Sequence, residues 1–569
     1  MICRLGSPRG IETFVEPPIP PLPASPGRVK DPRSITPALV YLPPVNTPNP
    51  GPRPAHNQLP NTRTPPMKSF KPFCLALTLL IAFGTAAQDV KTYAEGITPA
   101  DLKENLSILA SDAMEGRATG SRGQKMAAAF IRHHFESLGL KGPVNGSYYQ
   151  PVELYATTPA EIYVTTGGTR INNFTEVLYL GSADSRGEQK SAVVFVGKAS
   201  EAELAQVDLT GKAALVMMES LMSMRTWRTT ADLLRSKGAS MVFLTSNQPT
   251  DDFRKLVEQL QGFLSQGNLG LKRPDPNNPN KGMFIIDRTV AEKIMGQSME
   301  KLTKAMNGEA AKMPLKKLKP GNVAYHTSVN TRVVASENVL GFLEGTDKKD
   351  EVVVITSHYD HIGKNPGAAG DVINNGADDD GSGTVAVMEM ASEFARAKKD
   401  GKGPRRSILF MTVTAEEIGL LGSEYYAANP IFPIEKTVVD INIDMIGRND
   451  PEHAGKSDYV YVIGADKLSS ELHEINERNN ATYTQLAFDY TYNDENHPTN
   501  LYKRSDHWNF AKLGIPIVFY FDGIHEDYHK VTDEVSKIDF EILAKRARAA
   551  FYTAWEVANR EERLKVDKK

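Results

Sequence analysis

Histidine and carboxylate side chains follow four separate apolar stretches in the second half of this 569-residue chain. Imidazole and carboxylate groups bind divalent metal ions and transfer protons in hydrolytic sites. A loop of sequence GADDDGSG, residues 376–383, adds three aspartates between the first two stretches. The stretches and the residues that follow them are 352–355 with Ser357, His358, Tyr359 and Asp360; 408–414 with Ala415, Glu416 and Glu417; 438–443 with Asp444; and 515–521 with Asp527, Tyr528 and His529.

These apolar stretches alternate with helical patterns, which indicates strands that run in the same direction. Apolar residues recur at helical spacing in 384–395, 469–479 and 538–559, and an earlier helical pattern covers 98–140. Alternation of this kind predicts an α/β fold, with a mostly parallel central sheet and helices on both faces. The carboxyl ends of parallel strands form one crevice, so side chains about 170 residues apart in sequence can meet there.

The composition of this residue set favours zinc. Two imidazoles and three carboxylates without a thiol suit a borderline divalent ion. If His358, Asp379, Glu417, Asp444 and His529 are the ligands, three negative charges face the four positive charges of two Zn²⁺ ions, and a bridging hydroxide would neutralise the site. One ion alone would leave three buried carboxylates poorly compensated, which is unfavourable. We therefore expect two zinc ions per subunit.

Each cluster also has a simpler explanation when it is considered alone. A histidine at a strand end is usually a hydrogen-bonded surface residue, a Glu-Glu pair is usually a solvated first helical turn, and an aspartate-rich glycine loop is usually a plain turn. The joint placement on successive strand ends favours a shared metal site. The histidines without such a framework are expected to lie behind the ligands or on the surface; they are His361, His497, His507 and His525.

The order of these motifs resembles the co-catalytic dizinc aminopeptidases related to bacterial leucyl aminopeptidase and glutamate carboxypeptidase. The resemblance covers about 95–155 and 326–560. The motifs that carry it are His358-x-Asp360, the GADDDGSG loop, Ala415-Glu416-Glu417-x-Gly419-x-x-Gly422-Ser423, Asp444-Met445 and Tyr528-His529-x-x-x-Asp533. It implies a zinc-exopeptidase fold of the phosphorylase/hydrolase-like type.

The resemblance also implies a role for each residue. Asp379 would bridge the two zinc ions, His358 and Asp444 would complete one metal site, and Glu417 and His529 would complete the other. The three expected catalytic residues are Glu416 as the general base, Asp360 as the residue that orients His358, and Tyr528 as a phenol that polarises the scissile carbonyl.

Residues 155–325 show a different sequence pattern, in which short β-rich runs alternate with Gly and Asp turns. This segment looks like the protease-associated domain that several relatives carry as an insertion, although its motifs match more loosely. The expected division is therefore an inserted β-rich domain at 155–325 and a catalytic domain formed by 88–154 and 326–569.

The resemblance implies a zinc metallopeptidase, most simply an aminopeptidase that removes N-terminal residues from peptides. The metal ligands do not distinguish which end of a peptide is bound, so a carboxypeptidase or dipeptidase is the nearest alternative. A glutaminyl cyclase uses a related site, and the β-rich insertion makes it less favoured. A non-catalytic, receptor-like binding protein is disfavoured by the intact ligand set.

The first ninety residues show the features of an export signal and no pattern of a folded domain. Residues 1–66 contain 18 of the 36 prolines, and we interpret them as a disordered segment and a gene-model extension. Residues 67–87 have a basic start, an apolar run at 73–83 and small residues at the end, as a signal peptide cleaved after Ala87 does. We expect a periplasmic or secreted protein without a stable membrane anchor after signal removal.

Composition excludes several other classes. The 66 basic and 69 acidic side chains give a formal net charge of -3, so the chain has no electrostatic footprint for nucleic acid. Both cysteines, Cys3 and Cys74, precede the expected cleavage site, which excludes cysteine proteases and thiol-ligated metal sites from the mature chain. The expected partners are peptide substrates.

Overall fold

The computed structural model describes residues 90–568, apart from 186, 222–223, 274–281, 307–313, 366 and 368. The expected extension 1–66 and signal peptide 67–87 lie outside the described residues and stay predictions. All described residues belong to the compact unit Phe73–Lys569. Within this part of the chain, no helix is both long and apolar enough to cross a lipid bilayer.

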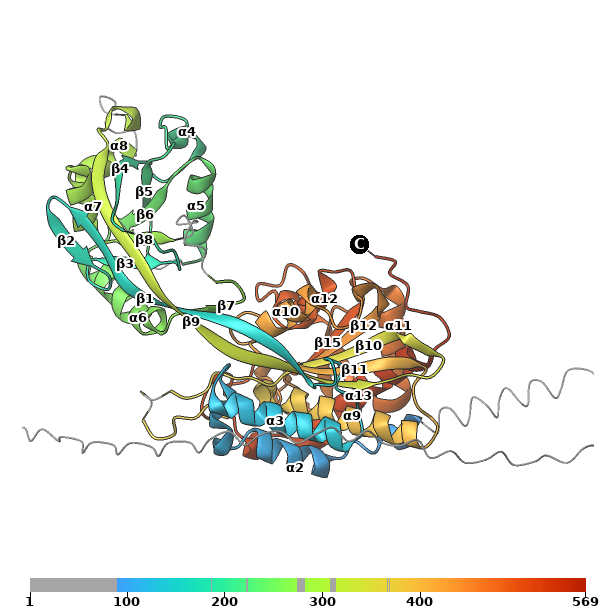
Figure 1. The fold of residues 1–569 in the computed structure, drawn as a ribbon. Coiled ribbons are helices and arrows are strands. Elements are labelled where there is room, and N and C mark those ends of the chain that lie inside the picture. Colours follow the sequence, from blue (N-terminus) through green and yellow to red (C-terminus); the bar gives the residue numbers. More distant parts are fainter. Residues whose placement is uncertain are drawn as a thin grey trace, which may run out of the picture. The chain divides into compact units, whose positions relative to one another are not determined.

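The segments that carry the predicted site form a mixed, mostly parallel sheet (Figure 1). Its order is β14-β13-β15-β12-β10-β11-β9. β10 runs parallel to β11 and β12, and β12 runs parallel to β15, whereas β9 and β13 pair antiparallel with their neighbours β11 and β15. The bounds are β9 Gly321–Leu343, β10 Lys348–His358, β11 Arg406–Val413, β12 Thr437–Ile443, β13 Tyr459–Ile463, β14 Ala487–Asp489 and β15 Ile517–Phe521.

Helices cover both faces of this sheet, which confirms the predicted fold class (Figure 1). Successive side chains of a strand point to opposite faces, so Val353 and Ile355 pack in one apolar core and Val352 and Val354 in another. The first core includes α2 Pro99–Leu109, α3 Arg122–Ser137, α9 Gly383–Lys399, α11 Ser470–Asn479 and α13 Phe540–Asn559; the second includes α10 Leu421–Ala428 and α12 His507–Ala511.

The helical pattern expected over 98–140 is two helices with a break between them. Thr98 caps the start of α2, and Ser121 caps the start of α3. The intervening turn Asp112–Arg117 contains three consecutive residues in the left-handed region, Glu115, Gly116 and Arg117. Such backbone interrupts an α-helix, and the apolar spacing alone did not reveal it.

The segment expected as a β-rich insertion has apolar cores of its own and contains more helix than predicted. β4, β5, β6 and β8 form a parallel sheet, and amphipathic helices connect them. The bounds are β2 Thr169–Asn172, β3 Val177–Leu180, β4 Gln189–Phe195, α4 Glu201–Leu204, β5 Ala213–Met218, α5 Met224–Ser236, β6 Met241–Ser246, α6 Thr250–Gln266, β7 Asn268–Gly270, β8 Met283–Ile286, α7 Arg288–Met295 and α8 Met299–Met306.

The expected boundaries of the insertion fall inside two long strands. β1, Tyr149–Thr166, pairs antiparallel with β9 from Tyr149 opposite Val339 to Thr165 opposite Ala324. The ladder therefore continues across residues 154/155 and 325/326 without a linker. The division into domains stays a prediction.

Two helical glycines allow a test of the packing between α10 and β11. A Cβ atom on Gly422 would lie 2.1 Å from the carbonyl oxygen of Thr414, whereas a Cβ atom on Gly262 in α6 meets nothing within 4 Å. We expect Gly422→Ala to lower the free energy of unfolding by about 1–3 kcal/mol, because backbone must move to admit the methyl group. Gly262→Ala, the matched control, should raise it by up to about 1 kcal/mol. Urea unfolding of both variants measures these changes, and equal stabilisation by both would contradict the packing.

Candidate metal centre

The five predicted metal ligands converge at the carboxyl edge of the sheet. His358, the last residue of β10, lies with its Nε2 atom 3.3 Å from Asp379 Oδ1 and 3.5 Å from Asp444 Oδ1. His529 Nε2 lies 3.1 Å from Asp379 Oδ2 and 3.0 Å from Glu417 Oε2. The two carboxylate oxygens of Asp379 therefore face two different donor sets, which share this one residue.

The spacing of these donors fits zinc. Ligand atoms about 2.0–2.1 Å from a tetrahedral zinc ion are about 3.3 Å from one another. The nitrogen–oxygen separations of 3.0–3.5 Å in both donor sets agree with this value. The donor chemistry, one imidazole and two carboxylates in each set, suits the same metal.

Strand direction and unusual backbone conformations aim these side chains. β10, β11 and β12 are parallel, so the ligands that follow them reach the same edge. Ala415, Met445 and His529 have φ values of 59°, 57° and 57°, in the left-handed region that residues other than glycine seldom adopt. Backbone strain of this kind tends to collect at functional sites.

The three aspartates of the 376–383 loop have different partners. Asp380 accepts hydrogen bonds from three backbone amides, those of His358, Gly383 and Met445. Asp378 accepts from the amide of Gly447, and its Oδ2 lies 3.2 Å from His525 Nε2. Asp380 lies close enough to His358 and Asp444 to form a third donor group, but its oxygens accept hydrogen bonds from the backbone. Only Asp379 is directed at both histidine ligands.

Hydrogen bonds from histidine hold the Glu417 carboxylate in its charged form. Burial and the charge of Asp379 oppose its ionisation, but hydrogen bonds from His361 and His529 outweigh them and lower the pKa of Glu417. His361 is fully buried, and its Nδ1 lies 2.6 Å from Glu417 Oε1. The sequence placed His361 only behind the ligands or on the surface; the structure places it against one predicted ligand.

Asp360 supports the site in two ways. Its backbone carbonyl oxygen lies 3.1 Å from His358 Nδ1, whereas its carboxylate accepts from Thr119 Oγ1 at 2.8 Å and from the amide of Glu416 at 3.2 Å. Burial raises the pKa of Asp360 to about 6. The contact that orients the imidazole thus comes from the carbonyl oxygen, and the carboxylate fixes the turn that carries Glu416.

Glu416 and Tyr528 adjoin the two donor sets. Glu416 Oε2 lies 3.7 Å from His358 Nε2, and burial together with the neighbouring Asp444 raises the pKa of Glu416 well above its usual range. The ring of Tyr528 stacks on His529 with centroids 3.9 Å apart. Burial and the nearby carboxylate of Asp379 raise the pKa of the Tyr528 phenol, so it keeps its proton.

A small cavity opens directly onto these groups. Five of the predicted site residues line it, together with several apolar side chains. Its lining residues are His358, Asp379, Glu416, Asp444, Tyr528, Ser505, Arg504, Met445, Leu501, Phe519, Phe521 and Ile524. The predicted reactive groups and the apolar side chains therefore border the same opening.

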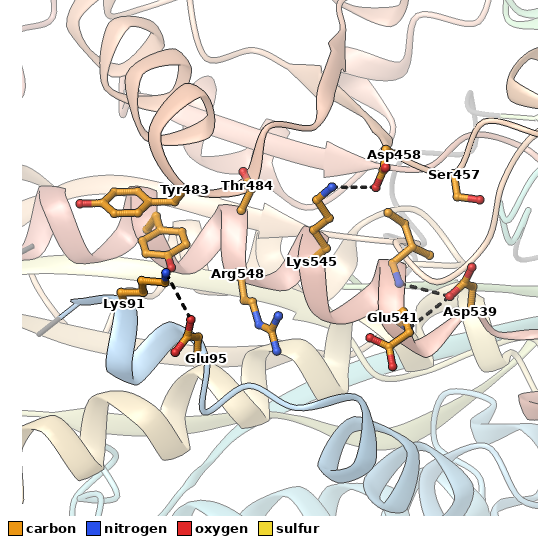
Figure 2. A pocket seen from close by; sticks show the side chains of 12 residues that line it. Lys91, Glu95, Ser457, Asp458, Tyr483, Thr484, Asp539, Glu541, Lys545 and Arg548 are labelled. Carbon is orange, nitrogen blue, oxygen red and sulfur yellow. Dashed lines mark hydrogen bonds and ion pairs between the residues drawn. The ribbon is translucent and has the colours of Figure 1, made fainter. Parts of the chain in front are cut away.

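A larger surface groove contains none of the predicted site residues (Figure 2). Four of its charged side chains form two ion pairs, Lys545 with Asp458 and Lys91 with Glu95. Exposed pairs of this kind contribute little. Among the described residues, the predicted site residues lie at the sheet edge and not in this groove.

Comparisons with known proteins identify related sequences. Residues 338–554 match Peptidase family M28. Aminopeptidase YwaD from Bacillus subtilis is 26% identical over 242 residues, which cover 41% of this chain and 47% of that protein. A probable glutamate carboxypeptidase from Arabidopsis thaliana is 28% identical over 197 residues, which cover 34% of this chain and 26% of that protein. The chain thus spans less than half the length of these two relatives.

A solved structure supports the fold. The aminopeptidase from Aneurinibacillus sp. strain AM-1 superposes with a TM-score of 0.50 at 19% sequence identity, over 84% of this chain and 98% of that one. The predicted metal ligands and the residues beside them all lie in the segment matched by sequence. The part of this chain that resembles peptidase family M28 is therefore residues 338–554.

Proposed function

We propose that this protein is an exported zinc aminopeptidase, which hydrolyses the N-terminal bond of peptides. The observation that carries this proposal is Asp379, whose two oxygens face two histidine-containing donor sets beside the carboxylate of Glu416. The proposal of export rests on the signal-like sequence of residues 67–87.

Five side chains would hold two zinc ions. His358 and Asp444 would bind one ion, Glu417 and His529 would bind the other, and Asp379 would bind both. When bound, the ions supply Lewis acidity, which lowers the pKa of a water molecule and polarises the peptide carbonyl group. Three carboxylates balance most of the added positive charge.

Glu416 is suited to move the proton in this reaction. It would accept a proton from the attacking water as the new carbon–oxygen bond forms, and would donate it to the leaving amine as the carbon–nitrogen bond breaks. Glu416 is not among the five predicted zinc ligands and lies 3.7 Å from His358, so its carboxylate is free to exchange this proton. Tyr528, which keeps its phenolic proton, would donate a hydrogen bond to the carbonyl oxygen of the substrate.

The cavity supports recognition of a peptide N-terminus. Asp379 and Asp444 would be occupied by zinc, so Glu416 is the lining carboxylate that would face the substrate amine. The apolar lining residues Phe519, Phe521 and Ile524 would accept an apolar side chain. One feature favours a carboxypeptidase or dipeptidase as the second candidate, because Arg504 also lines this cavity and could bind a substrate carboxylate.

The first prediction concerns which end of the peptide is recognised. We expect cleavage of a leucyl peptide with a blocked C-terminus and a free amine, and no cleavage when the amine is acetylated. Release of the amino acid, measured by chromatography with and without a chelator, distinguishes these cases. Turnover of only those substrates with a free C-terminus would select the second candidate instead.

A second prediction concerns the proton-transferring carboxylate. Glu416→Gln should retain zinc and lower kcat by about 10²–10⁴-fold, because the amide cannot accept the proton. Glu424→Gln, an equal charge change at an exposed position of α10, should keep both zinc content and kcat. A variant at position 416 with the kcat of the original protein would show that another group is the base.

A third prediction follows from the contact between His361 and Glu417. His361→Phe keeps a ring but removes the nitrogen that binds Glu417 Oε1, so zinc affinity should fall about 10–100-fold. His134→Phe removes a partly buried imidazole that bonds the Met388 carbonyl oxygen in α9, and should leave zinc affinity unchanged. Competition with a chromophoric chelator measures both affinities. Unchanged zinc binding by His361→Phe would limit His361 to packing.

A further inference from the structure

Arg117 holds the loop that precedes the predicted bridging carboxylate. Its guanidinium is fully buried and donates to the carbonyl oxygens of Asn375 at 2.6 Å and Gly376 at 2.8 Å. It also donates to the carbonyl oxygen of Tyr359 at 2.8 Å, directly after the ligand His358. One side chain thus fixes the backbone beside two predicted metal ligands.

Asp533 holds the same loop through its amide groups. Its carboxylate accepts from the amides of Asp378 and Asp379, each at 3.1 Å, and its carbonyl oxygen accepts from the amide of Ala377 at 3.2 Å. Asp533 is fully buried as well. It closes the motif that begins at Tyr528, and no role follows for it from the metal ligands themselves.

The two side chains divide the polar groups of one short loop between them. Arg117 donates hydrogen bonds to the carbonyl oxygens of residues 375–376, and Asp533 accepts hydrogen bonds from the amides of residues 377–379. Both the acceptors and the donors of the loop backbone are therefore bound. Buried charges need such partners, since an unpaired one is strongly destabilising. Burial lowers the pKa of Arg117, and the charges of Asp533 and Asp379 oppose that shift.

The segment around Arg117 is shaped for these contacts. Arg117 itself has a φ of 52°, a left-handed conformation that is unfavourable for a residue with a side chain. Two neighbours reach the same region, because Thr119 donates to the Asp360 carboxylate and Asp112 accepts from the Asn375 side chain, both at 2.8 Å. All three residues precede β1 in the chain.

We propose that Arg117 and Asp533 are positioning residues that fix the bridging carboxylate of Asp379. The zinc centre then depends on residues 112–119, which lie outside the segment 338–554 that matches the family. This inference rests on the proposed function only in requiring that the five ligands bind zinc. The two residues act through the backbone of the loop and touch neither substrate nor metal.

The test compares two buried arginines. Arg117 donates to a fourth carbonyl oxygen, that of Leu109 at 3.0 Å. Arg117→Lys keeps the charge, but an ammonium with three N–H donors cannot bond all four carbonyl oxygens, so zinc affinity should fall about 10–100-fold. Arg406→Lys is the matched control, because Arg406 is equally buried and donates to the carbonyl oxygens of Val557 and Arg560 away from the site. We expect the control to lower the unfolding midpoint in urea while its zinc affinity stays within about threefold of the original protein.

Asp533→Asn provides an independent variant if Arg117→Lys fails to fold. The amide loses the charge and one acceptor, and the same fall in zinc affinity is expected. Zinc affinity equal to that of the original protein in the folded variants, or an equal fall in Arg406→Lys, would overturn the proposal. An original protein that binds no zinc would instead overturn the proposed function, so chelator competition on all four proteins separates the two failures.

Discussion

The structure of the site depends on the repulsion between carboxylates that are buried together. Asp379, Glu417 and Asp444 lie within a few ångströms of other acids, in surroundings that weaken solvent screening. Cations and backbone amides must compensate for this charge. Histidines contact the predicted carboxylate ligands directly, whereas Asp378 and Asp380 behind them accept hydrogen bonds from backbone amides. Because these carboxylates need positive charge nearby, the same cluster also attracts divalent cations.

The sequence predicted the parts of this arrangement that follow from strand direction. Parallel strands end at one edge, so His358, Asp444 and Glu417 could be expected to meet from their positions after apolar stretches. The central position of Asp379 in its loop is also consistent with the structure, because its two neighbours are committed to backbone contacts. Helices on both faces follow from the alternation of patterns, and the structure confirms them.

Contacts that depend on side-chain direction could not be predicted in the same way. His361 is an ordinary residue in the sequence, and only its buried position shows that its ring reaches Glu417. Arg117 lies in a turn whose left-handed backbone interrupts a helical pattern, so periodicity gave no signal for it. In the 155–325 segment, the short apolar runs predicted the strands correctly. They did not predict the helices α5 and α6, because many polar residues stand between the apolar positions of these helices.

The first apolar core joins residues from both ends of the described chain. Leu102 and Leu106 of α2 pack there with Phe551 of α13, and the residues between them include the whole of the 155–325 segment. A ribosome makes the two early helices well before their partners, so their apolar faces have no native surface to cover during that interval. The intervening segment has apolar cores of its own. Because the chain is made from its N-terminus, the catalytic part and any metal site within it are completed only after the C-terminal helix has emerged.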